Sequence, residues 1–201
     1  MIEVIQCDQS SPEWYAARLG IPTASRFKDV LAKGEGKTRK RYMLDLAGER
    51  LTGEPCEGYS NAHMERGKAM EDEARDLYMF MTDAECKGVG FIRNGDKGAS
   101  PDSLIETNGM LEIKTKLPAL QIECILADKL PSEHVAQVQG ALWVAEREWL
   151  DFVSYWPKLP LFVKRIYRDE DYIKNLAAEV AKFNSEMLEL IEKIQPTKKA
   201  A

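Results

Sequence analysis

The stretch SPDSLI (residues 100–105), followed by GMLEIKT (residues 109–115), decides the predicted fold. The two segments read as short strands joined by the polar turn 106–109. Asn108-Gly109 in this turn is a strong signal for a β-hairpin. Because side chains alternate between the two faces of a strand, the second segment separates its side chains into two sets. We therefore expect a hairpin with one face turned into a sheet and the other free for polar groups.

Three side chains of this hairpin, two carboxylates and one ammonium, carry its chemistry. Glu112 and Lys114 point the same way, Ile113 points into the sheet, and the turn folds Asp102 back beside Glu112. Carboxylate oxygens suit a hard cation such as Mg²⁺, with Mn²⁺ as the alternative. A lysine beside such an ion can orient or deprotonate a water, or neutralise charge that develops on a phosphate. The pattern alone is common, because an outward Glu-x-Lys on a strand is usually a solvated face.

Composition describes an ordinary globular chain. Its 201 residues are 44% hydrophobic and 30% charged, which predicts a single domain over residues 1–201. No apolar run approaches the roughly 20 residues needed to span a bilayer, and the first residues lack a secretory pattern. The four cysteines are widely scattered, which favours free thiols in a cytoplasmic protein. The net charge of −5 counts against nucleic-acid binding by bulk attraction, but not against an enzyme with a basic channel.

The remaining chain predicts helices and strands in alternation. The helix over 61–81 would bury the stripe Met70, Ala74, Leu77 and Met81. Other helices are expected to begin near residues 12, 23, 40, 118, 131 and 169, the last one running to about 194 before a loose tail, 196–201. Strands are expected over 2–6, 86–94, 149–156 and 161–167. This order predicts an α/β fold with a central mixed sheet flanked by helices.

A second polar group precedes the hairpin. Thr23 is a good N-cap, which would place Ser25 in the first turn of a helix, where free N–H groups attract anions. Arg18, just before this turn, could complete a phosphate pocket. The alternative is plain capping with Arg18 in solvent.

Two further features have open interpretations. Glu71 lies at the edge of the buried stripe; it is either solvated or reaches the hairpin to hold a metal-bound water. The basic, glycine-rich segment 34–41 contains Gly-Lys-Thr without the spacing of a phosphate-binding P-loop. It is either an ordinary exposed loop or a mobile loop that touches a nucleic-acid backbone.

Four separated stretches together resemble one known family. They are RLGIPTAS (18–25), RGKAME (66–71), the pair SPD (100–102) and LEIK (111–114), and AQVQ (136–139). In this order they look like the phage lambda exonuclease family of alkaline exonucleases. That family belongs to the PD-(D/E)XK nuclease superfamily, so the resemblance implies a restriction-endonuclease-like core.

The resemblance also implies roles for single residues. Asp102, Glu112 and the Ile113 carbonyl would hold Mg²⁺, and Lys114 would act on the nucleophilic water. The implied catalytic set is completed by Glu71 and Gln137, and the residues implied to grip DNA phosphate are Arg18, Ser25 and Thr23.

The activity that the resemblance implies is degradation of linear double-stranded DNA from its 5′ end. Mononucleotides would be released and a 3′ single strand left for recombination. Members form a homotrimeric ring around DNA and work with a single-strand annealing protein. Two alternatives remain at this point: a structure-selective or restriction-type endonuclease, and an inactive relative that only binds DNA or a recombination partner.

Overall fold

The computed structural model describes residues 1–33, 36–56 and 62–195, with the backbone alone described over 62–69. Three features of the sequence lie outside the described residues. They are Gly34 and Glu35 of the basic segment, the side chains of RGKA (66–69), and the expected tail 196–201. Lys37 and the residues after it open helix α3 (Lys37–Thr52), so most of the basic segment is helical rather than a loop.

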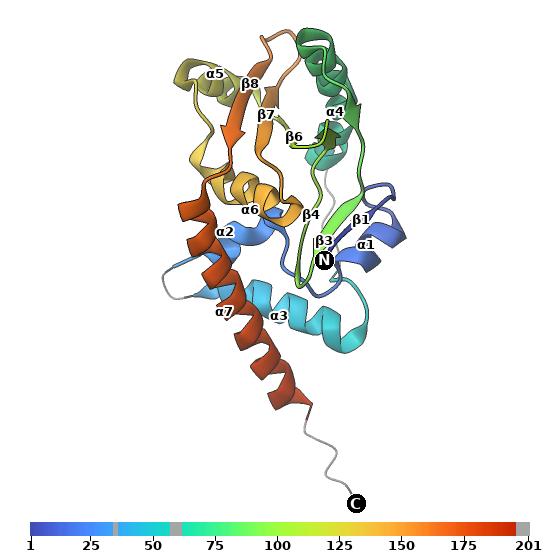
Figure 1. Cartoon of the computed structure of the whole chain (residues 1–201), viewed down its shortest axis with the longest axis vertical. Helices are drawn as coiled ribbons and strands as arrows, with labels where there is room; N and C mark the ends of the chain where they lie inside the picture. Colours follow the sequence, from blue (N-terminus) through green and yellow to red (C-terminus); the bar gives the residue numbers. More distant parts are fainter. Residues whose placement is uncertain (34–35, 57–61, 196–201) are drawn as a thin grey trace, which may run out of the picture.

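A five-stranded mixed sheet forms the centre of the molecule, as predicted (Figure 1). Its strand order is β2-β5-β6-β7-β8, with β6 and β7 parallel and the other neighbours antiparallel. The strands are β2 (Cys86–Lys87), β5 (Ser103–Ile105), β6 (Gly109–Thr115), β7 (Trp149–Tyr155) and β8 (Phe162–Tyr167).

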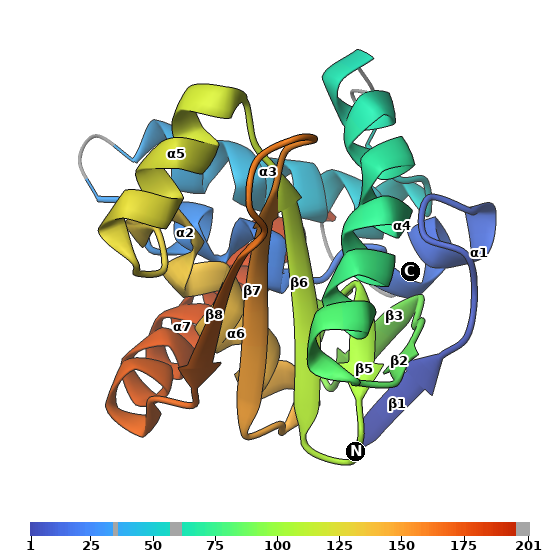
Figure 2. The same cartoon turned by 90° about the horizontal axis from the view of Figure 1, so that it is seen from above.

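Helices cover both faces of this sheet (Figure 2). On one face, α4 packs on alternate side chains of β6 and β7, among them Leu111, Ile113 and Val153. On the opposite face, Met110, Leu150 and Phe152 join the larger core. The helices are α1 (Pro12–Arg18), α2 (Phe27–Val30), α4 (Ala62–Thr82), α5 (Pro118–Ala127), α6 (Val135–Ala145) and α7 (Glu170–Ile194), with short 3-10 turns η1 (Ala24–Arg26) and η2 (Ser132–His134).

The predicted hairpin of β5 and β6 is confirmed, but its turn differs from the expected one. Ile105 lies opposite Gly109, so three residues, 106–108, connect the strands. Glu106 has the positive φ, +48°. Gly109 is already in the ladder, where a Cβ would lie 2.2 Å from the Trp149 ring. Close packing of the indole, and not turn geometry, therefore requires this glycine.

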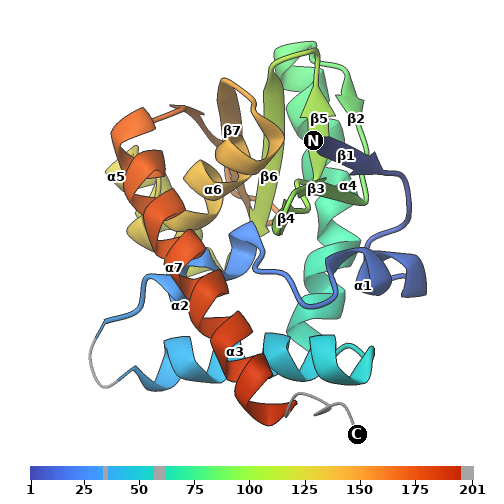
Figure 3. The ribbon, with the colours of Figure 1, turned by 60° about the horizontal axis from the view of Figure 1, so that its bottom comes forward.

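The strand expected over 86–94 is wrong as a single element. Its ends belong to different sheets: β2 pairs with β5, while β3 (Phe91–Asn94) joins β1 (Ile2–Ile5) and β4 (Lys97–Ala99) in a second, three-stranded sheet. Figure 3 shows this small sheet beside α1, with α3 crossing α7 below. The chain leaves β4 directly into Ser100 and Asp102, so the small sheet delivers the hairpin's first carboxylate.

The buried face of α4 differs from the predicted stripe at its C-terminal end. Ala74 is buried as expected, but Met81 is 59% exposed, and Tyr78 is fully buried instead. The Tyr78 hydroxyl donates to Asp151 Oδ2 at 2.7 Å. Asp151 also accepts two hydrogen bonds from Arg165, at 2.9 and 2.8 Å. A buried polar contact, which hydrophobic periodicity does not reveal, thus fixes α4 on the sheet.

Replacing Asp151 by alanine is expected to lower the free energy of unfolding by about 1–3 kcal/mol, because the buried Tyr78 hydroxyl loses its acceptor. The half-exposed Arg165 can turn to water and adds little. Urea unfolding measures the change. The double variant with Tyr78→Phe should recover much of the loss; a single variant as stable as the wild type would contradict this anchoring role.

Candidate active site

The hairpin brings Asp102 against β6, as the sequence predicted. Its backbone N–H donates to the Leu111 carbonyl at 3.1 Å. Its carboxylate Oδ2 accepts from the Ile113 N–H at 2.5 Å. The N–H and C=O of one strand residue point to the same side, so the Ile113 carbonyl also faces the side where β5 has ended. The Asp102 carboxylate and the Ile113 carbonyl therefore both face the edge of β6 that β5 leaves open.

Glu112 and Lys114 share the opposite face from Ile113, toward α6. Glu112 is 3% exposed, and its Oε1 accepts from Lys114 Nζ at 2.6 Å. The same oxygen accepts from Gln137 Nε2 of α6 at 2.5 Å. The structure therefore brings Glu112, Lys114 and Gln137 into direct contact, and α6 holds the orientation of the buried carboxylate.

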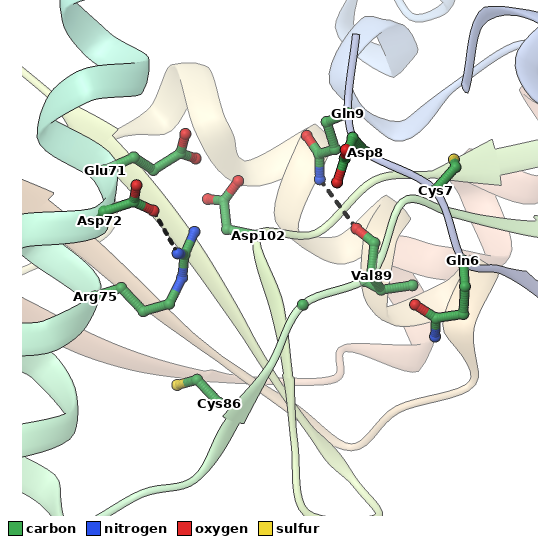
Figure 4. A pocket seen from close by; sticks show the side chains of 11 residues that line it. Gln6, Cys7, Asp8, Gln9, Glu71, Asp72, Arg75, Cys86, Val89 and Asp102 are labelled. Atoms are coloured by element: carbon green, nitrogen blue, oxygen red, sulfur yellow. Dashed lines mark hydrogen bonds and ion pairs between the residues drawn. The ribbon is translucent and has the colours of Figure 1, made fainter. Parts of the chain in front are cut away.

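Glu71 reaches the same place from α4. Figure 4 shows the carboxyl groups of Glu71 and Asp102 next to each other, and both residues line one cavity. This cavity measures about 840 Å³ and is lined by α4, β2 and the chain that follows β1. Glu71 thus lies beside Asp102, as the second of its two interpretations requires.

Burial and crowding of like charges shift the pKa values of these acids upward. Burial raises the pKa of Asp102 well above its ordinary value, and the neighbouring Glu71 carboxyl raises it further. Burial also raises the pKa of Glu112 to about 7, against the opposing charge of Lys114. Burial lowers the pKa of Lys114, but the charges of Glu112 and Asp102 outweigh burial and raise it.

These residues fit a divalent cation. Two buried carboxylates with raised pKa values carry repulsion that a cation would relieve, and the Ile113 carbonyl supplies a third oxygen beside them. Within the described part of the chain, no three His, Cys, Asp or Glu side chains group closely enough to hold a metal ion by themselves. Oxygen donors of this kind suit a hard divalent cation, for which waters and a substrate phosphate can complete the coordination.

The residues predicted to bind phosphate line a second, smaller cavity of about 30 Å³. Glu112 and Gln137 also line this cavity. Arg18, Thr23 and the exposed Ser25 line it. The predicted cap is wrong in detail: Thr23 precedes a 3-10 turn and its side chain makes no capping bond. Its hydroxyl instead accepts from Arg18 Nη2 at 3.4 Å and lies 3.3 Å from the Ser25 hydroxyl.

Sequence reasoning missed two members of this cavity. The Trp14 ring lies 4.0 Å from the Arg18 guanidinium, and its indole N–H donates to Ser100 Oγ at 2.8 Å. Ser100 and Trp14 both line the cavity. Two signals in the sequence could have identified these residues. Trp14 and Arg18 are four residues apart on one helix, and Ser100 directly precedes Pro101-Asp102.

The YqaJ-like viral recombinase domain matches residues 13–148. The chain belongs to this family. The matched span includes every proposed site residue from Arg18 to Gln137, and the match confirms the resemblance to lambda-type exonucleases. No curated protein matches this YqaJ-like chain.

Solved structures agree with this family assignment. The YqaJ-like chain is 38% identical to an alkaline exonuclease, LHK-Exo, from Laribacter hongkongensis, over 92% of this chain and 96% of that one, with a TM-score of 0.84. A structure of LHK-Exo in complex with dAMP gives 39% identity over the same shares, with a TM-score of 0.85. A phage-related exonuclease from Haemophilus somnus 129PT shares the fold at 15% identity, covering 87% and 96% of the two chains, with a TM-score of 0.66.

The match to LHK-Exo also bears on the class of the protein. Together with the family match, it supports a DNA exonuclease that acts in recombination.

Among the described residues, no helix is long and apolar enough to cross a membrane.

Proposed function

We propose that the chain is a Mg²⁺-dependent 5′-to-3′ exonuclease on linear double-stranded DNA. It releases mononucleotides and leaves a 3′ single strand for recombination by strand annealing. The observation that carries the proposal is the meeting of Asp102, Glu112 and the Ile113 carbonyl beside Lys114, with a cavity for an anion next to them. Mn²⁺ is the alternative ion.

Each side chain of the site has a distinct task in phosphodiester hydrolysis. A bound divalent ion would polarise the scissile phosphate and lower the pKa of its water. Asp102 and Glu112 are the carboxylates that would hold this ion. Lys114, whose ammonium lies 2.6 Å from Glu112, orients the attacking water and offsets charge that develops on the phosphate. Gln137 keeps Glu112 in place, and Glu71 would accept a hydrogen bond from a water on the Asp102 side.

The small cavity gives the reaction its direction. A 5′-terminal phosphate held by Arg18, Ser25 and Thr23 would place the first internucleotide linkage at the acids, because the cavity shares Glu112 with them. Positioning of this kind can supply much of a rate enhancement. A substrate without a 5′ phosphate would lose the charge-assisted contact to Arg18.

Arg18→Ala is expected to lower kcat/KM on 5′-phosphorylated duplex by about 10–100-fold, since hydrogen bonds to charged groups contribute about 1.5–3 kcal/mol. The rate on 5′-hydroxyl ends should change little. Arg93→Ala, a half-exposed arginine on β3, serves as the matched control. Equal rates of the wild type on phosphorylated and hydroxyl ends would refute the phosphate pocket.

A comparison of linear with closed circular duplex tests the exonuclease proposal itself. Linear DNA should be degraded to mononucleotides only when Mg²⁺ or Mn²⁺ is present, while closed circles stay intact. Cutting of the circles would favour a restriction-type endonuclease. No cutting of either substrate would favour an inactive DNA-binding relative.

The proposal includes a homotrimeric ring and a single-strand annealing partner, on the strength of the family resemblance. Encirclement would retain DNA without a strongly basic surface, which answers the net charge of −5. Light scattering should give a mass about three times the 22.8 kDa of one chain. A monomer at all concentrations, with and without DNA, would contradict the ring.

A further inference from the structure

The polar face of β6 continues past the proposed catalytic lysine. Lys116 follows the strand, and its backbone N–H donates to the Tyr155 carbonyl at 3.0 Å, which extends the ladder with β7. Alternation therefore puts Lys116 on the same face as Glu112 and Lys114. Residues two apart on a strand are separated by about 7 Å. This is close to the separation of consecutive phosphates along a DNA strand.

Lys116 is held in place by two neighbours in η2, the turn before α6. Its Nζ lies 3.1 Å from His134 Nε2 and 3.2 Å from Glu133 Oε1, and its side chain is 11% exposed. An ammonium can only donate, so His134 accepts through Nε2 and is neutral. The imidazole also packs against the Phe152 ring, with 5.1 Å between centroids. His134 thus orients the lysine without contributing a negative charge.

The surroundings of His134 carry more positive than negative charge. Burial lowers the pKa of His134 to about 4, and the charges of Lys116, Lys114 and Lys28 contribute to this shift. The carboxylate that faces the group from η2 is Glu133, which is 55% exposed and so is largely screened by water. A cationic cluster at this end of β6 suits an anion.

The cluster and the Arg18 cavity lie on opposite sides of the acids. Along α6, His134, Gln137 and Ala141 follow one another at intervals of about one turn. Gln137 and Ala141 line the cavity for the 5′ phosphate, whereas His134 contacts Lys116. A DNA strand with its 5′ end in the cavity therefore passes Glu112 and Lys114 before it reaches Lys116.

We propose that Lys116 binds the backbone phosphate that follows the scissile one, on the side away from the 5′ end. The inference rests on the proposed function and adds a contact on the strand that is still to be digested. This contact would keep the next linkage in register after each mononucleotide leaves.

The first test compares Lys116→Gln with the wild type in DNA binding at several salt concentrations, with Ca²⁺ in place of Mg²⁺ so that cleavage does not interfere. Loss of one phosphate contact should weaken binding several-fold and reduce the slope of log K against log salt by about one. In turnover with Mg²⁺, KM should rise in Lys116→Gln while kcat stays unchanged. Lys116→Arg should restore the DNA affinity and the wild-type KM. Lys182→Gln, at an exposed position of α7, should behave as wild type.

The second test uses DNA with one uncharged methylphosphonate at the second internucleotide linkage from the 5′ end. In the wild type this change should reproduce the loss seen with Lys116→Gln, and in the variant it should add nothing further. Additive losses, an unchanged salt slope, or a fall in kcat at constant KM would overturn the proposal. A wild type that binds but never cleaves would contradict the proposed function instead, and the salt slope would still decide on Lys116.

Discussion

Replacing Lys114 by alanine is expected to abolish DNA cleavage, with kcat lower by about 10²–10⁴-fold, the range for loss of a positioned proton-transfer or charge-stabilising group. DNA binding and fold should persist. The side chain is 32% exposed, and Glu112 keeps its hydrogen bond from Gln137 when the ammonium is removed. Single-turnover kinetics on 5′-phosphorylated duplex at saturating Mg²⁺ measure the effect.

Lys182→Ala is the control for the Lys114 variant, because it removes an exposed lysine from α7. Circular dichroism and DNA binding of Lys114→Ala should match this control. Turnover of Lys114→Ala within a few-fold of the wild type would remove the lysine from the mechanism. Loss of DNA binding would indicate a binding role in place of a chemical one.

The second large effect is expected for Asp102→Asn. The amide oxygen can still accept from the Ile113 N–H, so the local structure should persist, but one negative charge next to Glu71 is lost. Without metal the variant should be at least as stable as the wild type, because the repulsion that raises the pKa of Asp102 is gone. Activity should fall by more than about 10²-fold, since the ion loses a ligand.

Thermal unfolding with and without Mg²⁺ distinguishes this prediction from simple damage to the fold. Mg²⁺ should raise the melting temperature of the wild type but not that of Asp102→Asn. Asp128→Asn, at an exposed aspartate after α5, should keep the wild-type response. An Asp102→Asn variant that Mg²⁺ stabilises as strongly as the wild type would exclude Asp102 as a ligand.

The raised pKa of Glu112 predicts a pH dependence. Its folded-state pKa, about 7, lies above the ordinary 4.5, so between these values the folded state holds a proton that the unfolded state has released. Stability of the metal-free protein should therefore fall as pH rises through this window. Because ions bind the carboxylate form, Mg²⁺ should stabilise the protein more at pH 8.5 than at pH 5.5. An equal shift at both pH values would contradict the assignment.

Local sequence patterns were sufficient for the hairpin and the pairing of its acids. Alternation along β6 placed Glu112 and Lys114 together, and the short return from β5 placed Asp102 beside them. Both results follow from geometry within about fifteen residues of chain. The long helices and the central sheet followed in the same way from apolar spacing and from proline and glycine boundaries.

What the sequence could not predict depends on contacts between distant elements. Glu71 lies beside Asp102 because of the way α4 packs over the sheet, to which the Tyr78–Asp151 hydrogen bond contributes, and no periodicity encodes that pair. The small sheet was missed because β4 has three residues, one of them Gly98, and because β1, near the start of the chain, pairs with the distant strand β3. The contact of Lys116 with His134 likewise joins β6 to a turn that hydrophobic patterns do not place.

The most direct measurement is a crystal structure of the protein soaked in Mn²⁺, with the ion located by its anomalous scattering. We predict one ion bound by Asp102, Glu112 and the Ile113 carbonyl, with ligand distances of about 2.1–2.3 Å and Lys114 beside it. An ion bound elsewhere, or these carboxylates turned apart with no ion between them, would contradict the account.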